Sequence, residues 1–230
     1  MMETLVSIVL GTHIVAGTLS LAAAPVALVV RKGSRIHRLS GRIFFWLMTW
    51  VFITAVFLSA VKWIPFLLMI AVFSYFNVAV GYRSVYHKHI GHASGIKWYD
   101  WAMVVVALLF NAGMTVYGAV LVIDAGATIG YVSLFFGIGG GFLIIQRLVN
   151  FIKPPDDRHA WLYNHIGHMI GGYIGSCTAF SVVTISFLPG FVVWVWPSLL
   201  GFPLLSIWIR YYKHKLQEGA RLSDLVELKA

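Results

Sequence analysis

Two histidines, His165 and His168, lie three residues apart in the stretch WLYNHIGHMIGG at 161–172, which otherwise has the composition of a membrane helix. Helical spacing places both imidazoles on one face, together with Trp161 and Gly172. An ionisable side chain within a membrane costs free energy and usually faces other helices, where it marks an ion path, a cofactor or a polar network. Glycines four residues apart along the same stretch let a second helix approach closely. Such a pattern allows His165 and His168 to be ligands of a metal ion or of a haem, and it equally fits ordinary tight packing between helices.

A further histidine, His13, falls near the middle of the first apolar stretch. One interpretation is a neutral imidazole hydrogen-bonded to another helix, with Asn77, Asn111 and Thr115 as candidate partners. The other is a cofactor ligand or a group in a proton relay. The sequence leaves both open.

Depth in the membrane decides which histidines can share a ligand, because each helical residue advances about 1.5 Å along the axis. His13 and His168 lie at different depths and meet only if their helices tilt. We expect His165 to meet His37, His159 or a histidine of the 86–92 loop more easily, at the cytoplasmic side.

Basic residues and a histidine are combined in RKGSRIHRLSGRIFF at 31–45. Ser34 is a candidate N-cap, which places His37, Arg38 and Arg42 in the opening turns of a helix. The arginines can anchor that helix among lipid headgroups. Alternatively, Arg38 or Arg42 grips a propionate, phosphate or carboxylate while His37 ligates a cofactor or moves protons.

Three more histidines, His87, His89 and His92, belong to a loop. Soft ligands are missing there and carboxylates are few, so we expect solvated side chains and no metal site. Farther along the chain, Asp156 or Asp157 is expected to accept backbone N–H bonds where the next apolar stretch begins.

The elements that carry these residues are membrane helices. The chain has 230 residues, of which 60% are hydrophobic and only 11% charged, a composition typical of integral membrane proteins. The net charge of +9 is divided among short connections and forms no single stripe, which argues against nucleic acid as a partner. We expect the lipid bilayer as the surroundings, and other membrane subunits or further copies of the chain as partners.

Seven apolar stretches are each long enough to cross about 30 Å of hydrocarbon. They cover 4–30, 42–61, 64–82, 99–123, 128–149, 160–187 and 190–209. Of the 17 lysines and arginines, all except Lys62 then fall on one side of the membrane. The positive-inside rule predicts an outside N-terminus and a cytoplasmic C-terminus. The expected fold is all-α and polytopic, with a seven-helix bundle at 1–212 and a short amphipathic cytoplasmic tail at 213–230.

The segments THIVAGTLSL, KGSRIHRLSGRIFFW and HIGHMIGGYIGSCTAF give the chain an HRxxGR motif and a glycine-rich helix with an HxxH motif. With these it resembles a bacterial family of predicted multi-pass membrane proteins, a domain of unknown function. The resemblance covers most of the chain and implies a location in the bacterial cytoplasmic (inner) membrane. It points to His13, His37, His165 and His168 and implies no established activity.

Three classes of function fit these residues. The leading hypothesis is a histidine-ligated haem b or transition metal in a helical bundle that serves membrane redox chemistry. The second is a proton-coupled carrier of small solutes, in which His13, His165 and His168 titrate. The third is a non-catalytic subunit of a membrane complex, since the aromatic side chains supply surface for lipid and protein partners.

Overall fold

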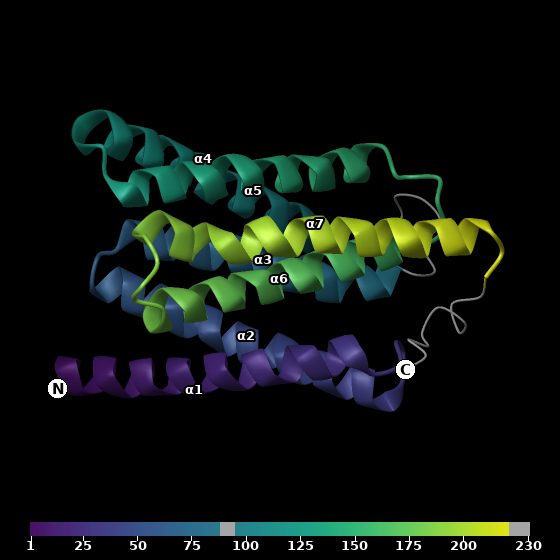
Figure 1. Ribbon diagram of the computed structural model, residues 1–230, viewed down its shortest axis with the longest axis horizontal. Coiled ribbons are helices and arrows are strands. Elements are labelled where there is room, and N and C mark those ends of the chain that lie inside the picture. Colours follow the sequence, from purple (N-terminus) through teal and green to yellow (C-terminus); the bar gives the residue numbers. More distant parts are fainter. Residues whose placement is uncertain (88–94, 221–230) are drawn as a thin grey trace.

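A computed structural model describes residues 1–87 and 95–220, and all the regular elements in these two ranges are helical. Seven long helices follow one another in the order of the chain, and a 3-10 turn, η1, lies after the third (Figure 1). Their bounds are α1 Met2–Val29, α2 Arg35–Val61, α3 Pro65–Ser84, η1 Val85–His87, α4 Trp98–Ala125, α5 Thr128–Ile152, α6 Ala160–Thr184 and α7 Gly190–Gln217.

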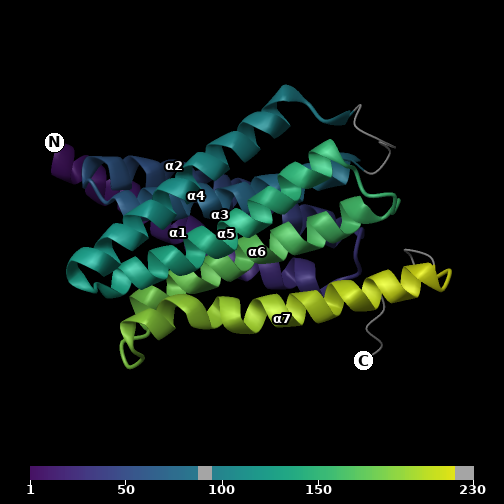
Figure 2. The ribbon, with the colours of Figure 1, turned by 90° about the horizontal axis from the view of Figure 1, so that it is seen from above.

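The helices form three layers. The hairpin α1–α2 lies on one side, α3, α6 and α7 form the middle, and the hairpin α4–α5 lies on the other side (Figures 1 and 2). Helix α3 connects the layers, because it packs against α2, α4 and α6. It contributes to both apolar cores, one shared with α4 and α5 and the other with α1, α2 and α6.

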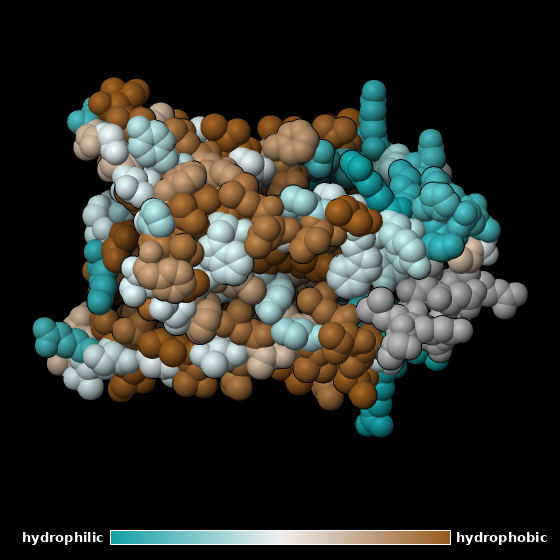
Figure 3. Space-filling view, in the orientation of Figure 1, coloured by the Kyte–Doolittle hydropathy of each residue, from teal (hydrophilic) through white to brown (hydrophobic). Residues whose placement is uncertain are grey.

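All seven helices are long and apolar enough to cross a membrane, as the sequence predicts. Their outer surface carries exposed Leu, Ile, Val and Trp side chains, and hydrophobic residues cover most of the length of the bundle (Figure 3). Hydrophilic residues gather at the end formed by 30–34, 85–87, 95–97, 153–159 and the last turns of α7 (Figure 3). We call this the cation-rich end. In the part of the chain that the structure describes, every lysine and arginine except Lys62 lies in these segments or in the helix turns next to them.

Two helices extend well beyond the apolar stretches that predict them. Helix α2 begins at Arg35, before the expected start at residue 42, and α7 continues to Gln217, beyond the expected end at residue 209. The expected division between bundle and tail at 212 and 213 therefore falls inside a helix. Residues 221–230 lie outside the described residues. Hydropathy marks only the part of a helix that lies in hydrocarbon, whereas a capped helix can continue into the headgroup region.

Glycines allow the closest approaches between helices. A Cβ atom at Gly172 of α6 would lie 2.5 Å from Val78 of α3, and one at Gly137 of α5 would lie 2.9 Å from the backbone nitrogen of Thr115 in α4. Both distances are shorter than van der Waals contact, so no larger residue fits without moving a helix. Glycine at these two positions sets how closely α6 packs against α3 and α5 against α4.

Candidate functional site

Helix α6 turns its histidine face onto α3. His165 Nδ1 lies 2.9 Å from the carbonyl oxygen of Gly81, and His168 Nδ1 lies 3.0 Å from Oδ1 of Asn77. Farther along the same face, Gly172 touches Val78. The prediction from helical spacing that His165, His168 and Gly172 share a face is confirmed, and all three contact α3.

The carbonyl group that binds His165 is available because α3 changes its pitch there. In a regular α-helix the N–H of Val85 would donate to the carbonyl of Gly81, four residues earlier. Here it points to the carbonyls of Tyr82 and Arg83. The last carbonyls of a helix need such outside donors. The imidazole of His165 therefore caps the C-terminal end of α3.

His37 makes the equivalent contact with α1. Its Nδ1 lies 3.0 Å from the carbonyl oxygen of Ala27, and Lys32 Nζ lies 3.2 Å from that same oxygen. Burial lowers the pKa of the Lys32 ammonium group. The backbone N–H of His37 donates to Ser34 Oγ at 3.2 Å, so the predicted N-cap is confirmed. This cap begins α2 early enough to place His37 over the end of α1.

The rings of His37 and His165 meet at the cation-rich end. Their centroids are 6.2 Å apart and their planes are inclined by 72°. Of the partners expected for His165, the one found is His37. We call these two residues the His37–His165 pair.

The hydrogen-bond partners assign the protons on these rings. A backbone carbonyl only accepts, so His37 and His165 each carry hydrogen on Nδ1 and, when neutral, a lone pair on Nε2. The Asn77 amide nitrogen donates to the Phe73 carbonyl at 3.0 Å, which directs its oxygen to His168. His168 therefore carries hydrogen on the same nitrogen.

Other predicted residues are placed elsewhere. His13 Nδ1 lies 2.8 Å from Thr54 Oγ1 on α2, so the expected partners on α3 and α4 are wrong. The side chain of Thr54 itself donates to backbone carbonyls of α2, which leaves its oxygen to accept from the imidazole. Since α1 packs chiefly against α2, the histidine bonds within that hairpin.

Arg38 and Arg42 are exposed at the cation-rich end. Each donates to a backbone carbonyl nearby in sequence, Arg38 to Gly33 and Arg42 to Arg38. These contacts agree with an anchor among headgroups, and they leave both side chains within reach of an anionic group at the surface.

A metal site built from protein side chains alone finds no support. In residues 1–87 and 95–220, His, Cys, Asp and Glu nowhere gather in a group of three or more that would hold a metal ion. The predicted metal ligands His165 and His168 bind separate groups of α3. A haem is a different case because its porphyrin supplies four ligands and the protein needs to supply only one or two.

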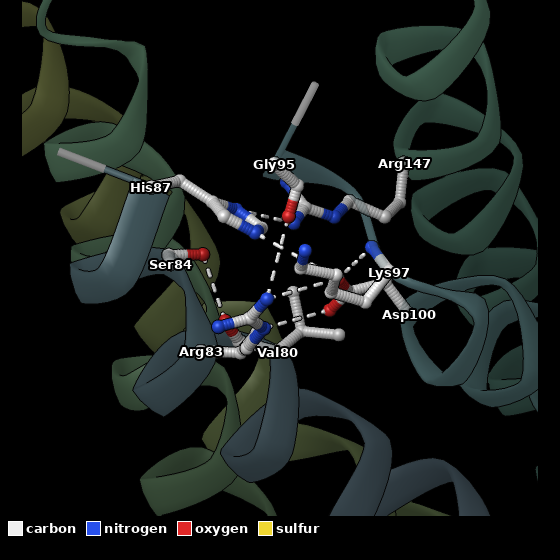
Figure 4. A network of polar contacts seen from close by, with 8 residues as sticks. All are labelled: Val80, Arg83, Ser84, His87, Gly95, Lys97, Asp100 and Arg147. Atoms are coloured by element: carbon white, nitrogen blue, oxygen red, sulfur yellow. Dashed lines mark hydrogen bonds and ion pairs between the residues drawn. The ribbon is translucent and has the colours of Figure 1, made fainter. Parts of the chain in front are cut away.

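A second polar cluster was missed by the sequence reasoning (Figure 4). Asp100, 1% exposed, binds Arg83 through both carboxylate oxygens, at 3.0 and 3.3 Å, and accepts the N–H of Lys97 at 2.8 Å. Close by, Arg147 Nη2 lies 3.4 Å from His87 Nδ1. One signal was available: Arg147 falls inside the predicted span 128–149, where an ionisable residue points to function.

The expectation of a solvated His87 is wrong, because only 15% of its side chain is exposed. His89 and His92 lie outside the described residues. The expected backbone bond at the start of the sixth span is confirmed, since Asp157 accepts the N–H of His159 at 2.8 Å.

The fold and the site together define a class of protein: an all-helical bundle of seven helices with membrane-spanning length and composition, carrying a pair of imidazoles at its cation-rich end. No known family matches the chain, and neither a curated protein nor a solved structure is similar to it. The resemblance to a bacterial membrane family stays a prediction from its motifs.

Proposed function

We propose that the chain is a membrane redox protein in which the His37–His165 pair binds a haem at the cation-rich end of the bundle. That end is the cytoplasmic one in this proposal, with the N-terminus outside, and the membrane is the bacterial inner membrane. Haem iron held by histidine carries single electrons, and the protein sets its potential through axial ligands and burial.

The observation that carries the proposal is the fixed orientation of both rings. Ligating histidines usually donate the other ring N–H to a carbonyl or carboxylate, which holds the ring and raises its basicity. His37 and His165 both make this bond, to the carbonyls of Ala27 and Gly81. Each keeps its Nε2 lone pair for a ligand.

The spacing of the rings supports the same assignment. The ring centroids of His37 and His165 lie 6.2 Å apart, so one bound group would be within reach of both imidazoles. The two histidines come from α2 and α6, as expected for a cofactor held between facing helices.

His168 and His13 take supporting places in this proposal. The bond between His168 and Asn77 holds α6 on α3 one turn below His165, and His13 joins α1 to α2. Arg38 and Arg42, exposed near the pair, are available to propionate groups.

Absorption spectroscopy and metal analysis of gently extracted protein test the proposal. The native protein should show a Soret band and about one iron per chain, and His37→Ala and His165→Ala should each lose most of both. His13→Ala is the matched control, because it removes an imidazole that is also hydrogen-bonded between helices, here α1 and α2, without touching the His37–His165 pair. It should keep the spectrum.

Two results would refute the haem. The first is colourless, iron-free native protein, also after expression with added haem precursor. The second is a Soret band that survives in the His37→Ala, His165→Ala double variant. A pH-dependent solute flux in liposomes that needs His165 would then favour the carrier, whereas stable co-purification of another membrane protein would favour the subunit of a complex.

A further inference from the structure

The cluster around Arg147 lies apart from the His37–His165 pair and joins α3, η1, α4 and α5 (Figure 4). The carboxylate of Asp100 already has hydrogen-bond partners for both of its oxygens. Asp100 accepts two bonds from Arg83 and one from the backbone of Lys97. Arg83 and Asp100 therefore form a neutral pair, and its remaining donor contact is with the Gly95 carbonyl at 3.4 Å.

Arg147 is left as a buried cation. Arg147 is only 5% exposed, and no carboxylate oxygen of the described residues lies within 4.0 Å of its guanidinium group. The ring face of Phe151, 4.7 Å away, and one nitrogen of His87 are its contacts. Its Nε–H has no hydrogen-bond partner in the described part of the chain. A buried charge without a counter-ion is strongly destabilising.

His87 adds a second unused donor to the cluster. Because Arg147 only donates, His87 Nδ1 must accept, so the ring hydrogen of the neutral imidazole lies on Nε2. Nε2 is buried, lies 3.9 Å from the nearer oxygen of Asp100, and has no hydrogen-bond partner among the described residues. That distance is too long for a hydrogen bond.

Both unused groups are donors, and the net charge of the four side chains is +1. Such a set lacks an acceptor with negative charge. Guanidinium groups match the oxygens of phosphate in charge and geometry. The cluster also lies beside segments 85–87 and 95–97 of the cation-rich end. Cationic ends of membrane helices are where headgroup phosphates gather.

We propose that Arg147 and His87 bind a phosphate group, supplied by a lipid headgroup or by a free phosphate anion. The phosphate oxygens accept from Arg147 Nε and His87 Nε2 and neutralise the unpaired cation, while the Arg83–Asp100 pair stays closed. The ligand thus joins α5 to η1, two elements that the 3.4 Å contact between Arg147 and His87 already brings together.

The test measures thermal unfolding of the full chain in a maltoside detergent, which contains no phosphate. Inorganic phosphate and phosphatidylglycerol are titrated separately at constant ionic strength, and native mass spectrometry records bound adducts. At a hundredfold excess over the dissociation constant, binding should raise the unfolding midpoint by roughly 5 °C or more. Stabilisation by phosphate alone identifies the free anion as sufficient, and stabilisation by the lipid alone identifies the headgroup.

Arg147→Gln should weaken binding at least about tenfold. Arg158→Gln is the control, because it removes the same charge from an exposed position at the same end. If Arg147→Gln does not fold, binding is measured on the native chain and on Arg147→Lys. Equilibrium dialysis of labelled phosphate and detection of adducts then decide whether the site binds phosphate. A native chain that neither ligand stabilises and that carries no adduct overturns the proposal, as does undiminished binding by Arg147→Gln.

Discussion

Replacement of Gly81 by alanine tests how α3 and α6 position His165. A Cβ atom at this position would lie 2.8 Å from the side chain of Met169 and also 2.8 Å from its backbone nitrogen. The side chain can turn away, but the backbone cannot, so α6 must move by about 0.6 Å to reach an ordinary contact distance. A shift of that size would lengthen the 2.9 Å bond between His165 and the Gly81 carbonyl to about 3.5 Å, beyond useful hydrogen bonding.

The energetic terms have opposite signs. Overpacking costs about 1–3 kcal/mol and the lost hydrogen bond about 1 kcal/mol, whereas alanine in a helix gains about 0.5–1 kcal/mol over glycine. We expect Gly81→Ala to lower the free energy of unfolding by about 2 kcal/mol. Gly139→Ala is the matched control, because nothing lies within 4 Å of a Cβ atom there. It should be as stable as the native chain or slightly more stable.

Denaturant unfolding in detergent, followed by far-UV circular dichroism, measures the difference between the two variants. Nitrogen-15 spectra of the imidazoles report separately whether His165 keeps its hydrogen on Nδ1. If Gly81→Ala unfolds with the same free energy as Gly139→Ala and its His165 signal is unchanged, the close approach of α3 and α6 does not position this histidine.

Two further predictions concern charge. Asp100→Asn removes the counter-ion of Arg83 and should lower the free energy of unfolding by about 3 kcal/mol, the low end for a buried pair because 19% of the Arg83 side chain is exposed. Asp124→Asn, an exposed position on the same helix, should change it little, and equal losses in the two variants would contradict a special role for Asp100. For the orientation, single cysteines placed at residues 2 and 218 of a Cys177→Ser background should react with an impermeant thiol reagent from opposite sides of intact membrane vesicles. Labelling of both from one side would refute the predicted topology.

The sequence alone predicts much of the local structure. The apolar stretches place all seven helices, and Ser34 places the start of α2. Helical spacing also predicts that His165 and His168 share a face, and axial rise makes His37 one candidate partner of His165, beside His159 and the 86–92 loop. These predictions succeed because they depend on hydropathy and on residues close together in the chain, which lipid and helix geometry constrain directly.

Partners between helices were harder to predict. His13 binds Thr54 and none of the candidates Asn77, Asn111 and Thr115. Arg147 lies beside His87, 60 residues away in sequence. A span has several faces, and hydropathy does not say which neighbour each face meets. Only the layered packing, with α3 between the hairpins, decides that Asn77 faces α6.

The sequence by itself determined a chain of seven membrane helices, with cations gathered at one end and with histidines that need hydrogen-bond partners. Only the tertiary structure decided which partner each histidine binds, because hydrogen bonds between helices depend on how the helices are arranged and rotated. The carbonyls that bind His37 and His165 belong to the ends of α1 and α3, and every residue has such a carbonyl. Side-chain types therefore cannot reveal which carbonyl is left free, whereas the end of a folded helix does.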